Sequence, residues 1–226
     1  PGLQGLHAAV VRKLDGDPLK EYRIQIELPW MDGKNKLLWA RLSTVYATNA
    51  SGNFFLPEPD DEVVVGFMNE DPGHPIILGG VYGERHKPPY EYEAKNNTKA
   101  IVTREKMRIE FNEEKKMVKI STPGKNTVEI SDDDKHIKLT DQNKNEIVMN
   151  SSGISFSSAK DITLKAKGAI TMDATSKFSA TAKQDVSLEG LNVNMQAKVS
   201  AAVKGNAKAE LSASGQTTDK GGMVII

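Results

Sequence analysis

Histidine, cysteine and clustered carboxylates are the side chains that most often carry proton transfer, nucleophilic attack or metal binding. This sequence has no cysteine, which excludes disulfides, thiol nucleophiles and thiolate metal ligands. Its histidines are scattered without ligand spacing, at His7, His74, His86 and His136. The order of the residues supports neither a serine–histidine–aspartate triad nor a glycosidase-like pair of carboxylates. We therefore predict no enzyme, no catalytic residue and no cofactor.

Two polar segments have the residue types that could bind a cation. Residues 141–145 (DQNKN) begin like a calcium loop. Such a loop needs glycine where Glu146 stands and a bidentate glutamate where Ser152 stands, so we expect no calcium there. The three aspartates at 132–134 separate two apolar segments, and we interpret them as a solvated turn. The sequence thus predicts no metal site.

The overall charge indicates which partners the chain attracts. Its 30 lysines and arginines balance 30 aspartates and glutamates over 226 residues. A balanced chain has no cationic field that attracts nucleic acid or anionic lipid, so we predict no nucleic-acid partner. No apolar run approaches the ~20 residues that span a bilayer, and residues 1–11 do not resemble a signal peptide. We expect any export to depend on another signal.

The first part of the chain must form a compact element, because it holds most of the aromatic residues. Short alternating or apolar segments are separated there by turn residues such as those at 15–18 (DGDP). In residues 21–28, the pattern places Tyr22, Ile24, Ile26 and Leu28 on one face. Five strands are expected, at 7–14, 21–28, 36–44, 62–67 and 75–82. They predict a small closed barrel over residues 1–85, followed by a linker over 86–105.

The rest of the chain, 106–226, repeats a pair of apolar residues at every second position, followed by a polar turn. The repeat wanders between seven and ten residues at first and settles at eight from Ile154, apart from one seven-residue step. Eight residues are enough for one strand and one turn, and such a unit cannot complete a coil of a β-helix within a single chain. We therefore predict an intertwined triple-stranded β-helix formed by three copies, whose strands find partners in the other chains. Its predicted core residues are Ile154, Phe156, Ile162, Leu164, Ile170, Met172, Phe178, Val186, Leu188, Val193, Met195 and Leu211.

Alanine and serine are frequent between residues 197 and 214, which leaves two interpretations. The segment is either a fraying low-complexity tail or a narrowing end of the β-helix that admits only small side chains. Val199, Val203 and Leu211 stand at the alternate positions expected for inward-facing side chains, which favours the narrowing end of the β-helix.

Several motifs together resemble the VgrG spike proteins of type VI secretion and related contractile injection systems. They are residues 1–6 (PGLQGL), 14–18 (LDGDP), 22–29, 54–67 (FFLPEPDDEVVVGF), 69–75 (NEDPGHP), 77–82 (ILGGVY) and the octads after Ser158. The resemblance covers essentially the whole chain. It implies an OB-fold barrel and a homotrimeric three-chain β-helix at the tip of a phage-tail-like tube. A hub region usually precedes the barrel in that family, so we interpret this sequence as a fragment or as a spike with a separate hub.

The last residues of the sequence are apolar: Gly222, Met223, Val224, Ile225 and Ile226. In a trimer, three copies would make a flat apolar platform. The resemblance implies that a conical PAAR-type protein docks on such a tip. The alternative is an ordinary last strand.

The resemblance implies a structural spike that punctures a target-cell membrane mechanically. Its expected partners are two further copies, the tip protein, hub and tube proteins and secreted effectors. We expect assembly in the bacterial cytoplasm, followed by expulsion with the apparatus. An alternative is an OB-fold protein that binds nucleic acid or carbohydrate and has a repetitive tail, although the acidic residues at 58–62 and 70–71 argue against nucleic acid. A third is an enzyme such as a cell-wall hydrolase carried on a spike.

Overall fold

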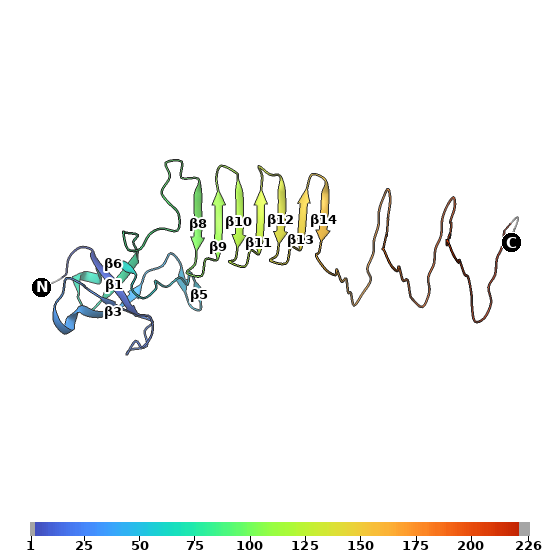
Figure 1. Cartoon of the computed structure of the whole chain (residues 1–226). Coiled ribbons are helices and arrows are strands. Elements are labelled where there is room, and N and C mark those ends of the chain that lie inside the picture. The colour runs from blue at the N-terminus through green and yellow to red at the C-terminus, as the bar shows by residue number, and fades with distance from the viewer. Residues whose placement is uncertain (1–2, 222–226) are drawn as a thin grey trace. The chain divides into compact units, whose positions relative to one another are not determined.

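The computed structural model describes residues 3–221, and these contain strands and two short 3-10 helices but no α-helix. The chain divides into two compact units, Pro1–Thr163 and Leu164–Ile226, and we describe each by itself. Within the described residues, we find no helix long and apolar enough to span a membrane. The predicted all-β class is therefore confirmed (Figure 1).

The N-terminal strands close into a five-stranded barrel in the order β1-β2-β3-β7-β6, which confirms the predicted barrel. Its strands are β1 (His7–Lys13), β2 (Ile24–Glu27), β3 (Leu37–Leu42), β6 (Glu62–Phe67) and β7 (Pro75–Gly80). All pairs are antiparallel except β3 with β7. Between β3 and β6 lies a small hairpin of β4 (Ala47–Thr48) and β5 (Ser51–Gly52). The helices η1 (Gly33–Lys36) and η2 (Met68–Glu70) connect barrel strands.

Alternation along the strands fills the barrel with aliphatic side chains. The buried core consists of Ala9, Val11, Ile24, Ile26, Leu28, Ala40, Val63, Val65 and Ile77. The prediction that Tyr22 shares the buried face of Ile24, Ile26 and Leu28 is wrong. Tyr22 precedes β2 in a left-handed backbone conformation (φ 58°), and its side chain is 97% exposed. That change of conformation breaks the alternation before Ile24.

A second sheet follows in the same unit and forms a seven-stranded antiparallel meander (Figure 1). Its strands are β8 (Thr98–Val102), β9 (Arg108–Asn112), β10 (Met117–Ser121), β11 (Thr127–Ser131), β12 (His136–Thr140), β13 (Glu146–Asn150) and β14 (Gly153–Ser157). The first of them lies inside the range predicted as a linker. The expectation that all strands after residue 106 pair only between chains is wrong for β9–β14, because each pairs with its neighbours in the same chain. Turns of five and four residues alternate from β8 to β13, and a two-residue turn joins β13 to β14, so each strand runs back beside the one before it.

The alternating turn lengths give the meander a hairpin repeat of 19 residues, which explains the uneven early spacing. Three equivalent turns begin at Thr103, Thr122 and Asp141, which are 19 residues apart in the sequence. Each of the first five turns has a lysine in the left-handed region: Lys106, Lys116, Lys125, Lys135 and Lys144, with φ between 46° and 69°. A side chain normally disfavours that conformation, so these positions carry local strain.

The described part of the second unit, residues 164–221, contains no strand. It is extended and bends at 167–168, 175–176, 183–184, 191, 198–199, 206–207 and 214–215. The bends therefore recur every eight residues with one seven-residue step, which confirms the octad register (Figure 1).

Candidate assembly surface

One face of the β8–β14 sheet is lined by two continuous rows of apolar side chains, which we call the apolar face. In the pairing register, the residues of the first row lie opposite one another on successive strands. They are Ile101, Ile109, Ile120, Val128, Leu139, Ile147 and Phe156. The other row contains Phe111, Val118, Ile130, Ile137, Met149 and Ile154. Each strand contributes alternate residues to this face because side chains in a strand point to opposite sides.

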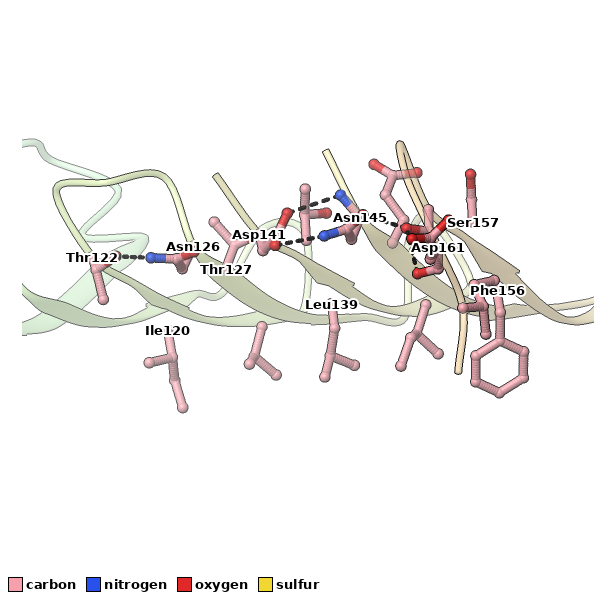
Figure 2. A pocket seen from close by; sticks show the side chains of 16 residues that line it. Ile120, Thr122, Asn126, Thr127, Leu139, Asp141, Asn145, Phe156, Ser157 and Asp161 are labelled. Carbon is pink, nitrogen blue, oxygen red and sulfur yellow. Dashed lines mark hydrogen bonds between the residues drawn. The ribbon is translucent and has the colours of Figure 1, made fainter. Parts of the chain in front are cut away.

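None of these side chains is buried within the chain. Phe156 is 66% exposed and Ile154 65%, whereas the barrel residue Ile26 is fully buried. Figure 2 shows Ile120, Leu139 and Phe156 of the first row pointing to one side of the sheet. These three residues line a groove of about 550 Å³, which Ile162 also lines. Leaving a large aliphatic side chain in water forfeits about 1.5 to 3 kcal/mol, so a face of this size requires a cover.

The opposite face of the same sheet is polar and carries cross-strand ion pairs. Lys119 Nζ lies 2.9 Å from Glu129 Oε2, and Lys138 Nζ lies 2.7 Å from Glu146 Oε1. The hydrogen bond from Lys119 is the main cause that lowers the pKa of Glu129 below its ordinary value, and a contact with His136 lowers it further. Charged groups that satisfy one another in this way suit a face in contact with water. The sheet therefore presents its apolar face for assembly and its polar face to solvent.

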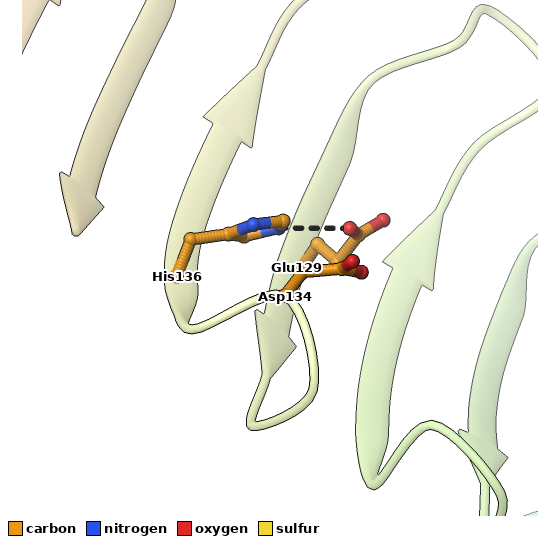
Figure 3. Close-up of side chains that lie close together, drawn as sticks. All are labelled: Glu129, Asp134 and His136. Carbon is orange, nitrogen blue, oxygen red and sulfur yellow. Dashed lines mark hydrogen bonds and ion pairs between the residues drawn. The ribbon is translucent and has the colours of Figure 1, made fainter. Parts of the chain in front are cut away.

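Glu129, Asp134 and His136 form the one potential metal cluster found among the described residues, with ligand atoms within 4.8 Å of one another (Figure 3). Their oxygens and nitrogen already have partners. Glu129 contacts Lys119 and, at 2.9 Å, His136 Nε2, while Asp134 Oδ2 accepts a hydrogen bond from Ser131 Oγ. The sequence alone does not reveal this proximity, because it depends on the register between β11 and β12. The three aspartates at 132–134 do lie in an exposed turn, as predicted.

The segment that resembles a calcium loop is a turn between β12 and β13. The carboxylate of Asp141 accepts hydrogen bonds from the backbone N–H groups of Asn143 and Asn145 and from both side-chain amides. These bonds, chiefly that from the Asn145 backbone, lower the pKa of Asp141. Because N–H donors occupy both carboxylate oxygens, the residues act as a turn brace.

Asparagine side chains also connect successive turns at one edge of the sheet. Asn126 Oδ1 accepts from the Gln142 backbone N–H at 3.0 Å, and Asn145 Oδ1 accepts from Ser158 Oγ at 2.9 Å. The two accepting asparagines are 19 residues apart, and the bonds connect segments along this edge of the sheet. Sequence reasoning missed them, although the matching positions of Asn126 and Asn145 were a signal.

The other histidines have local structural contacts. His7 packs against Trp30 and Phe67 with ring centroids 5.0 and 5.5 Å away. His74 Nδ1 lies 2.9 Å from the Asp71 carboxylate within one turn, and His86 lies 3.7 Å from that of Asp61.

The predicted core residues of the β-helix fall in two places. Ile154 and Phe156 lie in β14 on the apolar face. The others occupy the extended segment and are at least half exposed in a single chain, so one chain does not bring them together: Ile162, Leu164, Ile170, Met172, Phe178, Val186, Leu188, Val193, Met195 and Leu211. Their role in a shared core stays a prediction. The predicted tip, residues 222–226, lies outside the described residues.

Comparison with known proteins gives independent evidence for both parts of the chain. Residues 7–82 match the type VI secretion system/phage-baseplate injector OB domain, and residues 117–197 match the phage baseplate V C-terminal trimerisation domain. The chain is 30% identical over 111 residues to the type VI secretion system spike protein VgrG1a of Pseudomonas aeruginosa, and 32% identical over 101 residues to VgrG1c of that organism. It is also 30% identical over 112 residues to the actin cross-linking toxin VgrG1 of Vibrio cholerae.

These alignments cover 46%, 42% and 46% of this chain but only 17%, 14% and 10% of the respective relatives. The chain thus matches less than a fifth of each of these proteins. The two domain matches together span more than half of the chain. The first covers the closed barrel, and the second begins at β10 and runs through β14 into the extended segment. The chain therefore contains an injector OB domain of the type VI secretion system/phage-baseplate kind and a phage baseplate V C-terminal trimerisation domain, and it is similar to VgrG spike proteins.

Proposed function

We propose that three copies of this chain assemble into the central spike of a contractile injection apparatus of the type VI secretion or phage-baseplate kind. The observation that carries the proposal is the apolar face of β8–β14, which one chain leaves uncovered. Three such sheets, each with its apolar face inward, close a three-sided prism with a dry interior. The match to a trimerisation domain supports three copies over two.

The octads after residue 158 fit the same assembly in a different way. Their extended backbone needs hydrogen-bond partners, and a strand from each of two other chains supplies them. The prism therefore continues as an intertwined β-helix, in which residues such as Leu164 and Ile170 face the common axis. Continuous hydrogen bonding between chains would make the structure stiff without disulfides.

The proposed action is mechanical. Contraction of a sheath drives the tube, and the stiff spike concentrates that force on a narrow tip that punctures the target membrane. Hub and tube proteins would hold the other end, a PAAR-type protein would dock on residues 222–226, and effectors would travel with the complex. Like the relatives that are named type VI secretion spike proteins, the trimer would leave the cytoplasm with the apparatus.

Binding of nucleic acid by the barrel receives no support from its charges. Arg12 pairs with Glu27 and Asp60, and Lys36 pairs with Glu27 at 3.0 Å. Arg23 pairs with Asp17 at 2.6 Å. Cations neutralised in this way do not form the positive groove that single-stranded nucleic acid requires.

The function is tested by complementation in the bacterium that encodes the chain. Deletion of the gene should abolish release of tube protein into the medium and killing of target cells. The unaltered gene and a Lys165→Asp variant should restore both, whereas Leu164→Asp should restore neither, because it places three carboxylates on the proposed axis. Normal tube release after deletion would contradict the proposal.

A further inference from the structure

The two edges of the β8–β14 sheet differ in charge. At one edge, the turn at 122–126 has Lys125 as its sole charged residue, and the turn at 141–145 has Lys144 together with Asp141, whose carboxylate is held by Asn143 and Asn145. At the other edge, the turn between β11 and β12 carries three successive aspartates at 132–134 followed by Lys135, which leaves this turn with a net negative charge. The central turns of the two edges thus differ in net charge: the turn at 122–126 is positive, the turn at 141–145 is balanced, and the turn at 132–135 is negative.

Four of these charges have no ion-pair partner among the described residues of their own chain. Lys125, Lys144, Asp132 and Asp133 are exposed, and none makes an ion pair within the part of the chain that the structure describes. Asp134 differs, because its backbone N–H and its carboxylate both bond to Ser131 Oγ. The nearby ions of the sheet, Lys119 with Glu129 and Lys138 with Glu146, are already paired.

The meander also fixes the relative heights of these turns. The aspartate turn joins β11 to β12, the Lys125 turn joins β10 to β11, and the Lys144 turn joins β12 to β13. Neighbouring strands are about 4.8 Å apart, so the aspartate turn lies midway between the two lysine turns, about one strand spacing from each. Within a chain, however, the width of the sheet separates the two edges.

We propose that Asp132 and Asp133 of one copy pair with Lys125 and Lys144 of the next copy at the corners of the trimer. The inference rests on the proposed trimer, with the axis along the direction in which the strands stack. A rotation about such an axis does not move a chain along the axis. Equivalent turns of all three copies therefore lie at the same height. Three sheets arranged in a ring bring the lysine edge of each against the aspartate edge of its neighbour. The aspartates of one copy then lie between the two lysines of the next.

The pairing is tested by reversing the charges of each edge. One variant carries Asp132→Lys and Asp133→Lys, a second carries Lys125→Asp and Lys144→Asp, and a third combines all four substitutions. Aspartate tolerates the left-handed conformation of the two lysines, so the second variant adds little backbone strain. Trimer dissociation and the Tm are measured at ionic strengths of about 0.01 M and about 1 M, where the Debye lengths are about 30 Å and 3 Å.

At low salt, each single-edge variant should lower the Tm by about 3 °C, because like charges meet at all three corners. The combined variant should recover the Tm of the unaltered trimer, and at high salt the differences should vanish. Additive losses in the combined variant would overturn the pairing while leaving the trimer intact. A folded monomer before any substitution would instead overturn the proposed assembly and the pairing with it.

Discussion

The barrel and the β8–β14 sheet are built from the same alternation of apolar and polar residues, yet they use it differently. In the barrel, five strands close on themselves, and Val11, Ile26 and Ile77 are fully buried within one chain. In the meander, seven strands form an open strip, and its corresponding side chains remain exposed, as at Ile130 and Ile137. Closure of the sheet therefore decides whether the core belongs to one chain or to an assembly.

The comparison shows why the two regions should respond differently to mutation. The barrel core depends on contacts within the chain, so its stability should not depend on protein concentration. The apolar face and the octads depend on other copies, so their stability should rise with concentration.

The largest effect is expected from a residue that faces the proposed trimer axis, where the core excludes water. Ile170→Asp should prevent trimer formation, because three unpaired carboxylates in an apolar core cost several kcal/mol each. In a single chain Ile170 is 53% exposed, so a protein that acts as a monomer would tolerate the change. Sedimentation should show loss of the trimer for Ile170→Asp and an intact trimer for Lys165→Asp. Equal behaviour of the two variants would show that the inside-outside register is wrong.

A matched pair of truncations separates the two kinds of core. Ile26→Ala should destabilise the barrel by about 2 to 5 kcal/mol, with a barrel transition that does not depend on concentration. Ile130→Ala should lower a Tm that increases with protein concentration. Differential scanning calorimetry over a range of concentrations measures both. If the Tm of Ile130→Ala did not depend on concentration, the apolar face would be covered by the same chain and not by other copies.

A smaller effect is expected from the first turn of the barrel. The Arg23 guanidinium, together with three backbone N–H groups, lowers the pKa of Asp17 well below its ordinary value. A lowered pKa means that the carboxylate stabilises the fold above the unfolded value near 3.9 and loses this contribution as the pH falls through the native value. Asp17→Asn should therefore lower the barrel Tm at neutral pH, and the difference from the unaltered protein should shrink below about pH 4.

The control for that experiment is Asp15→Asn, since Asp15 is exposed in the same segment. It should leave the Tm and its pH dependence unchanged. A deficit for Asp17→Asn that persists undiminished under acid conditions would mean that its ionisation does not stabilise the barrel.

The smallest effect concerns the strained turns of the meander. Lys116 has a φ of 46°, a conformation that glycine adopts without the cost borne by a side chain. Lys116→Gly should therefore stabilise each chain by about 0.5 kcal/mol, after the greater freedom of glycine in the unfolded chain is included. Lys115→Gly, which removes the same charge at a neighbouring exposed position, should destabilise it. Chemical denaturation compares the two, and destabilisation by both would contradict the assigned strain.

The sequence was sufficient to predict the closed barrel, because its short strands are separated by strong turn residues such as those at 15–18. It was also sufficient for the octads, whose bends keep the predicted register. It was not sufficient for the meander, where turns of four and five residues alternate and obscure the 19-residue repeat. Whether such a strand pairs within its chain or between chains depends on turn geometry, and lysine is an unexpected residue for the left-handed positions of these turns.

The candidate surface was predicted only in part for a related reason. The alternation of apolar residues identified the apolar pair of each strand from Ile109 and Phe111 to Ile154 and Phe156. The cluster of Glu129 with His136 and the braces made by Asn126 and Asn145 depend instead on cross-strand register. Register is a property of paired strands and is not visible in the periodicity of one strand.

The central claim is that the apolar face belongs to an assembly of three copies. Light scattering coupled to size-exclusion chromatography measures this most directly, with circular dichroism to verify that the eluted protein is rich in β-structure. The account predicts a molar mass of three times the 24.7 kDa of one chain. A stable, folded species of 24.7 kDa would contradict it.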